Sequence, residues 1–134
     1  MSNAPSPPRW SPAPSPEGDP PPKGPYSPAV RAGGFIYVSG QTPRDPATGE
    51  IVGTSVEAQS RRTLENLRRV VSAAGGTLAD VVSVTVYLAD MAQWNAFNGV
   101  YREFFHEPYP SRTAVGASLR GILVEVSAVA YVGS

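Results

Sequence analysis

A single acidic residue interrupts the most apolar stretch of the chain. Glu125 lies within Ile122-Leu-Val-Glu-Val-Ser-Ala-Val-Ala-Tyr-Val132, which has the composition of a β-strand. A carboxylate in such surroundings is costly unless it is paired or hydrogen-bonded. A carboxyl group held between apolar neighbours also suits general acid or base chemistry. Glu125 is therefore a candidate for proton transfer, or else half of a buried ion pair, or a residue at an edge open to water.

Arg112 is the second residue with a chemical use, and it directly follows Tyr109-Pro-Ser111. Its planar guanidinium can hold a carboxylate through two parallel hydrogen bonds. We expect strands at 112–118 and 122–132, joined around Gly121, so that Arg112 and Glu125 could lie on adjacent strands. The two residues are then either a structural ion pair or the two ends of a substrate site. The sequence leaves both interpretations open.

Several other kinds of site are excluded by composition. The chain has no cysteine and a single histidine, His106, so thiolate chemistry and disulfides are absent and no metal-ligand set accompanies the histidine. It contains neither a Ser-His-Asp set nor a glycine-rich phosphate-binding motif. We expect neither a metal nor a cofactor. The net charge is +0, which gives no general attraction to nucleic acid.

The N-terminal part of the chain has a composition of its own. Of the 15 prolines, 11 lie between Pro5 and Pro28, and residues 1–22 hold one large apolar side chain, Trp10. Such a segment buries too little surface to offset its ordering entropy. We expect a disordered proline-rich tail over 1–22 and one domain over 23–134. No apolar run resembles a signal peptide or a membrane span, so the cytoplasm is the expected location.

The elements that must position Glu125 and Arg112 follow the order strand, strand, helix, strand, helix, strand, strand. A tight turn at Gly33-Gly34 joins the first two strands. The first helix begins near Thr54 or Ser55 and ends at Gly75-Gly76, and the second follows Asp90 and stops at Pro108. This order predicts an α+β fold with two helices packed on one face of a mixed sheet.

The uncovered face of that sheet is expected to be half polar. In the strand 81–88, alternation places Val82, Val84, Val86 and Leu88 on one side. Ser83, Thr85 and Tyr87 then lie on the other side. Because the helices cover only one side, this second face favours contact with another subunit. A solvated antiparallel face is the alternative.

Several ordered motifs resemble those of the RidA/YjgF family of reactive-intermediate deaminases, formerly called L-PSP endoribonucleases. The resemblance covers residues 23–134. It implies a chorismate-mutase-like fold with a mixed six-stranded sheet, and a homotrimer whose sites lie between subunits. The motifs are Gly24-Pro-Tyr-Ser-Pro-Ala-Val30, Ile36-Tyr-Val-Ser-Gly-Gln41, Asp45-Pro-Ala-Thr-Gly-Glu50, Pro110-Ser-Arg112 and Val124-Glu-Val126.

The resemblance also implies an activity, the hydrolysis of 2-imino or enamino acids to 2-keto acids with release of ammonia. No metal, cofactor, nucleic acid or membrane takes part. By position, Arg112 matches the carboxylate-binding arginine of the family, and Glu125 matches the glutamate that positions water. Three further residues match positions that line the family's substrate pocket: Tyr26, Ser39 and Asn98.

Two departures from the family pattern keep other functions open. Ala114 stands where many bacterial members have cysteine, and the turn 117–121 lacks the usual Leu-Pro. One alternative is a pathway-dedicated relative, such as an aminomuconate-type deaminase or an enzyme of natural-product biosynthesis. Another is a non-enzymatic or RNA-directed role, against which the neutral charge argues.

Overall fold

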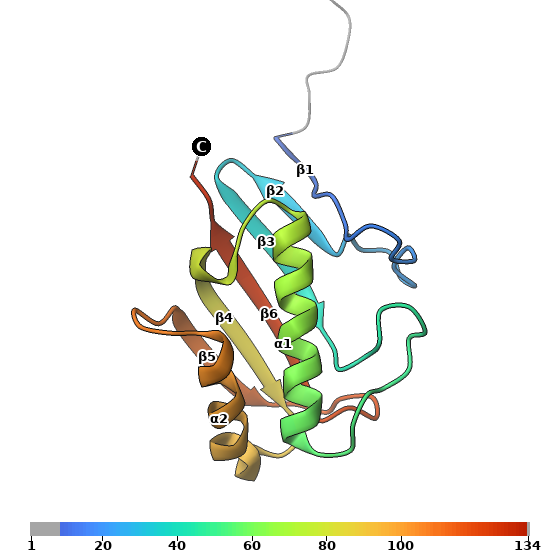
Figure 1. Cartoon of the computed structure of the whole chain (residues 1–134), viewed down its shortest axis with the longest axis vertical. Coiled ribbons are helices and arrows are strands. Elements are labelled where there is room, and N and C mark those ends of the chain that lie inside the picture. Colours follow the sequence, from blue (N-terminus) through green and yellow to red (C-terminus); the bar gives the residue numbers. More distant parts are fainter. Residues whose placement is uncertain (1–8, 134) are drawn as a thin grey trace, which may run out of the picture.

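Six strands form one mixed sheet in the order β1-β2-β3-β6-β4-β5, in a computed structural model that describes residues 9–133. All neighbouring strands are antiparallel except β4 and β5. Two helices, α1 (Val56–Ala73) and α2 (Trp94–Phe104), lie on the same side of the sheet (Figure 1). The predicted α+β fold is thus confirmed. The strands are β1 (Trp10–Pro12), β2 (Ala29–Ala32), β3 (Phe35–Gln41), β4 (Val81–Leu88), β5 (Ser111–Gly116) and β6 (Val124–Tyr131).

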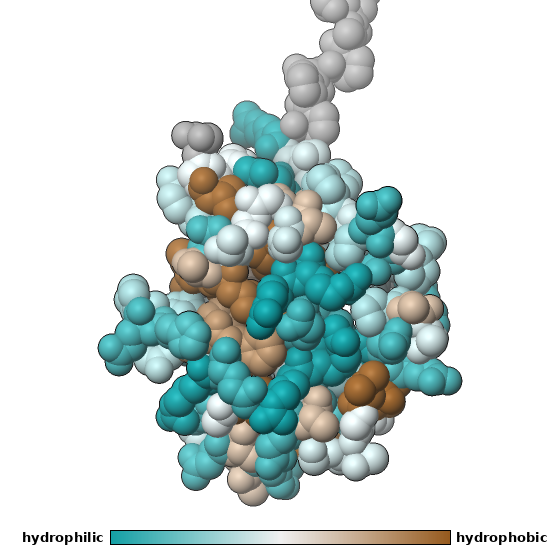
Figure 2. Space-filling view, in the orientation of Figure 1, coloured by the Kyte–Doolittle hydropathy of each residue, from teal (hydrophilic) through white to brown (hydrophobic). Residues whose placement is uncertain are grey.

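The first helix has the boundaries that its capping residues predict. The Ser55 side chain accepts a hydrogen bond from the Ala58 backbone N–H at 3.1 Å, which satisfies one unpaired donor of the first turn. Gly75, at φ +103°, allows the left-handed conformation that ends the helix. The outer surface of α1 is mainly hydrophilic (Figure 2), while Leu64, Leu67 and Val71 are fully buried beneath it.

Strand β6 shows how the sheet divides into two faces. Val124, Val126, Ala128 and Ala130 are buried against the helices, while the residues between them point the other way and are half-buried or exposed. We call these sides the helix-covered face and the open face. Glu125 lies on the open face, because it alternates with the buried positions.

The predicted alternation in β4 is wrong at its first residues. Val81 pairs with Ala130 and Ser83 with Val129, so one extra residue is accommodated between them. This bulge leaves Val81 buried at 5% exposure and Val82 exposed at 45%. An extra residue shifts the side-chain alternation by one, which a strict two-residue period cannot anticipate.

The last two strands are not neighbours, contrary to the expected pairing of 112–118 with 122–132. Strand β4 lies between β5 and β6, and β5 runs parallel to β4. Parallel strands need a crossover connection, and α2 supplies it between β4 and β5. The strand-helix-strand order around α2 therefore determined this pairing rather than the short turn near Gly121.

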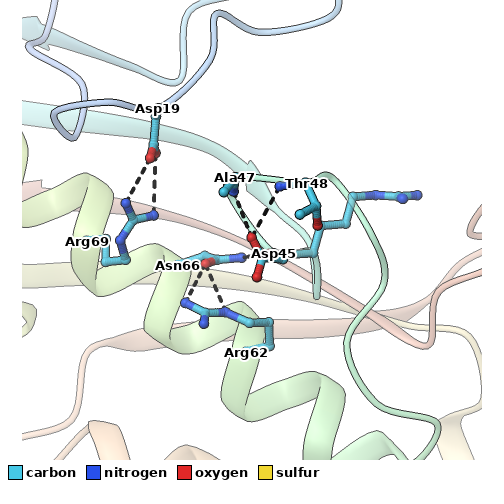
Figure 3. A network of polar contacts seen from close by, with 8 residues as sticks. Asp19, Asp45, Ala47, Thr48, Arg62, Asn66 and Arg69 are labelled. Atoms are coloured by element: carbon cyan, nitrogen blue, oxygen red, sulfur yellow. Dashed lines mark hydrogen bonds and ion pairs between the residues drawn. The ribbon is translucent and has the colours of Figure 1, made fainter.

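Part of the segment predicted to be a tail is packed against the domain. Residues 1–8 lie outside the described part, but β1 pairs antiparallel with β2 and the Ala13 N–H donates to the Ala29 carbonyl at 2.9 Å. Asp19 forms an ion pair with Arg69 of α1 at 2.9 Å (Figure 3). Backbone hydrogen bonds to a sheet edge require no apolar side chains, so composition alone did not reveal these contacts. Within residues 9–133, neither helix has the length and apolar character that crossing a bilayer requires.

Candidate active site

Arg112 is held by aromatic rings of the neighbouring helix. In β5 it is level with Val84 of β4, a buried residue, so its side chain rises from the helix-covered face. Its guanidinium carbon lies 4.8 Å from the Tyr101 ring centre, 5.0 Å from that of Trp94 and 5.7 Å from that of Phe97. Cation-π contacts of this kind orient the guanidinium without neutralising its charge.

The structure does not make Arg112 and Glu125 an ion pair. Arg112 is aligned with Val84 and then Ala128, whereas Glu125 is aligned with Tyr87 three residues further along β4 and lies on the open face. Among the described residues, no carboxylate forms a salt bridge with Arg112. A half-buried guanidinium without an acidic partner is suited to receive an anion from outside the chain.

A pocket of about 320 Å³ opens beside Arg112. Two buried polar atoms in its lining, the Asn98 Oδ1 and the Tyr101 hydroxyl, have no hydrogen-bond partner in the described structure. Burial raises the pKa of Tyr101 to about 12, although the nearby charge of Arg112 opposes this shift. A cation, a protonated hydroxyl and an amide oxygen thus belong to residues that line the pocket. It is lined by Asn98, Tyr101, Arg102, Tyr109, Pro110 and Arg112.

Glu125 lies over an interruption in the neighbouring strand. The register of β3 against β6 shifts between Val38 and Gln41, which adds one residue around Ser39 and Gly40. A Cβ built on Gly40 would lie 2.8 Å from the Glu125 Oε2, so the bare glycine makes room for the carboxylate. The Ser39 hydroxyl donates to the Ser27 carbonyl at 2.7 Å, and its oxygen can still accept.

Tyr26 lies at the same end of the sheet and is 56% exposed. With Gly40 and Gln41 it lines a hollow of about 170 Å³ against the N-terminal segment. An exposed phenol ring at this place can contact a second molecule. Tyr26 directly precedes Ser27, whose carbonyl accepts the Ser39 hydroxyl, so the structure places Tyr26 near Ser39 and not beside Arg112.

The five predicted site residues thus fall into two half-sites. The arginine half-site contains Arg112 and Asn98 on the helix-covered face, and the glutamate half-site contains Tyr26, Ser39 and Glu125. The sheet separates Arg112 from Glu125, so one small ligand cannot touch both in a single chain. Each half-site must be completed by other groups if the two act on one substrate.

Sequence reasoning missed part of the arginine half-site. Trp94, Phe97 and Tyr101 have the helical spacing of an apolar stripe, which by itself indicates only packing. The spacing of Trp94 and Tyr101 from Asn98 was the available signal, because residues three or four apart on a helix share a face. Tyr101 and Arg102 follow Asn98 at these distances, and both line the pocket.

Comparison with known proteins gives concordant matches over nearly the whole chain. The family described as Endoribonuclease L-PSP matches residues 17–132. A RutC family protein of Pyrococcus horikoshii is 47% identical over 117 residues, which are 86% of this chain and 93% of the relative. The human 2-iminobutanoate/2-iminopropanoate deaminase is 38% identical over 82% of each chain. The crystal structure of a putative endoribonuclease from Thermotoga maritima superposes with a TM-score of 0.83 at 37% identity, covering 89% of this chain and 95% of the other.

Proposed function

Because this chain belongs to the RidA/YjgF family, we propose that it hydrolyses small 2-imino or enamino acids to 2-keto acids and releases ammonia. The observation that carries the proposal is the guanidinium of Arg112, which has no acidic partner within residues 9–133 and is held by aromatic rings at the wall of a pocket. A receptor for a carboxylate is what such a substrate requires. The name of the human relative agrees with this substrate class.

The chemistry needs little beyond orientation and proton transfer. The carbon of a protonated C=N group is already electrophilic, so a held water can attack it. Arg112 fixes the carboxylate and thereby the position of that carbon. Glu125 accepts a proton from the attacking water and returns one to the nitrogen, after which the C–N bond breaks and ammonia leaves. As ammonia leaves, the hydroxyl formed from water gives its remaining proton to Glu125 and becomes the carbonyl of the keto acid.

We further propose that the active unit is a homotrimer in which the arginine half-site of one subunit faces the glutamate half-site of the next. The separation of Arg112 and Glu125 by the sheet supports this arrangement. So does an aromatic cluster on the open face, where the Phe35 and Tyr131 ring centres are 5.0 Å apart. Phe35, Tyr37 and Tyr131 are 39–50% exposed in the single chain. Exposed aromatic clusters of this kind commonly become buried between subunits.

The test is a competition assay. An amino-acid oxidase generates 2-iminobutanoate in place, and semicarbazide traps whatever imine has not been hydrolysed. We expect the wild-type protein to reduce trapping, and a folded Glu125→Gln variant to be slower by about two orders of magnitude or more, since an amide cannot cycle a proton. Absence of acceleration by the wild type for any small 2-imino acid would favour a pathway-dedicated relative instead. A panel that includes dicarboxylate enamines then separates these two functions.

A further inference from the structure

We infer that the Tyr101 hydroxyl is a further substrate-binding group, which donates a hydrogen bond to the carboxylate gripped by Arg112. This inference deepens the proposed deaminase function and rests on it for the identity of the ligand. Nothing in the motifs that place this chain in its family singles out Tyr101. The argument comes from its burial, its packing and its neighbours.

The hydroxyl is buried and unsatisfied. Tyr101 is 5% exposed, its oxygen has no hydrogen-bond partner among the described residues, and the residue lines the pocket beside Arg112. Buried polar groups in folded proteins are nearly always paired, because an unpaired one has lost its bonds to water without replacement. Phenylalanine would fill the same space without that cost. The presence of tyrosine therefore calls for a partner that is not part of the chain.

The packing of the ring holds the Tyr101 side chain in place. The Tyr101 ring stacks on Phe105, with centres 4.6 Å apart and planes 21° apart, and it contacts Phe97 with centres 5.7 Å apart. The Arg112 guanidinium lies 4.8 Å from the same ring. A ring held by these neighbours cannot swing its hydroxyl out to bulk water. The oxygen therefore stays on a residue that lines the same pocket as Arg112.

The three polar groups of the pocket match a 2-imino acid. Arg112 and Tyr101 donate hydrogen bonds, and they suit the two oxygens of a carboxylate. The Asn98 Oδ1, which is also buried and unpartnered, accepts and suits the adjacent N–H of the imine. Since burial raises the pKa of Tyr101 to about 12, the phenol remains a donor throughout the neutral range. A phenolate would instead repel the carboxylate.

The experiment compares Tyr101→Phe with Thr63→Val, a control that removes another buried hydroxyl with no partner among the described residues, on α1 and outside the pocket. Three quantities are measured for each: the melting temperature without ligand, the dissociation constant of the product 2-oxobutanoate, and kcat/KM for 2-iminobutanoate. For Tyr101→Phe we expect an unchanged or higher melting temperature. We also expect a weakening of 2-oxobutanoate binding by about 10- to 100-fold, as for a lost hydrogen bond to a charged group, and a similar loss in kcat/KM.

Binding of 2-butanone, which has no acceptor in place of the carboxylate, provides the specificity control and should not distinguish Tyr101→Phe from the wild type. Wild-type affinity of Tyr101→Phe for 2-oxobutanoate would overturn the inference. So would a lower melting temperature with unaltered affinity, which would assign the hydroxyl to a structural contact or a subunit interface. If the wild type binds 2-oxobutanoate through Tyr101 but hydrolyses no imine, the proposed function fails and this inference stands. If it neither binds nor hydrolyses, both fail.

Discussion

The charge of Arg112 is oriented by aromatic rings and not by an acid. Whether Arg112 has an acidic partner decides whether replacing it mainly affects folding or ligand binding. An arginine paired with a buried carboxylate leaves an orphaned charge when it is removed, which destabilises the fold strongly. Arg112 has no such partner among the described residues. Its removal should therefore affect ligand binding more than folding.

We predict that Arg112→Lys fails almost as badly as Arg112→Ala in imine hydrolysis, with kcat/KM lower by about 100-fold or more in both. Lysine keeps the charge but loses the planar two-point contact, so the imine carbon is misaligned. Both variants should stay folded, with free energies of unfolding within about 1.5 kcal/mol of the wild type. Competition assays and chemical denaturation measure the two effects. Near wild-type turnover by Arg112→Lys would refute the carboxylate-binding role.

Gly40 offers a way to disturb Glu125 without changing it. The added methyl group of Gly40→Ala would overlap the carboxyl end of Glu125, which is flexible enough to move away. We expect a folded protein with turnover reduced by at least about tenfold, because displacing a proton-transfer group misaligns the water that it holds. Gly99→Ala is the matched control, since its Cβ would meet nothing within 4 Å. Equal activity of both variants would show that the position of Glu125 is unimportant.

At the scale of elements, one crossover connection and one β-bulge position the candidate site residues. The crossover from β4 through α2 to β5 brings Arg112 beneath the aromatic side of α2. The bulge in β3 at Ser39 and Gly40 opens the space that the Glu125 carboxylate occupies. The N-terminal segment has a different role, because β1 extends the sheet edge and Asp19 ties the segment to α1.

Two truncated proteins distinguish the contributions of residues 1–8 and residues 9–22 to the stability of the fold. We predict that removing residues 1–8 leaves the melting temperature unchanged. Removing residues 1–22 should lower it by several degrees, since the β1–β2 hydrogen bonds and the partly buried Asp19–Arg69 pair each contribute about 1 kcal/mol. Calorimetry on the two truncated proteins tests this. Equal stability of both would support the tail over 1–22 that composition predicts.

At the scale of the whole molecule, the division into half-sites makes assembly a requirement of the proposed mechanism. Arg112 and Glu125 lie on opposite faces of one sheet, so under that mechanism each meets its counterpart from another copy. In a closed ring the two half-sites can face each other at every interface. Sedimentation equilibrium should accordingly report a trimer at micromolar concentration, and a monomer would exclude the shared site.

Mixing inactive subunits tests the shared site directly. We predict that Arg112→Ala and Glu125→Gln proteins, each nearly inactive alone, regain activity when they are unfolded together and refolded as mixed trimers. With random assembly of equal amounts, about one quarter of the interfaces would combine an intact arginine half-site with an intact glutamate half-site. Mixing the folded homotrimers without exchange is the control. No recovery from verified mixed trimers would mean that each site uses one chain only.

The sequence by itself determined both helices and five of the six strands, and it singled out the candidate reactive residues. Ser55 and Gly75 bound the first helix, and alternating apolar residues mark β6, because capping and side-chain periodicity are local properties. The isolated charge of Glu125 in an apolar strand and the Pro110-Ser-Arg112 motif were likewise visible without the fold.

Only the tertiary structure decided which of these residues meet. Strand order depends on long-range pairing, so the insertion of β4 between β5 and β6 could not be deduced from the short connection at residues 117–123. The bulge at Val82 depends on its partner strand. The consequence for function is that Arg112 and Glu125, close in sequence, lie on opposite faces of the sheet, while Tyr101 comes from the preceding helix to lie against Arg112.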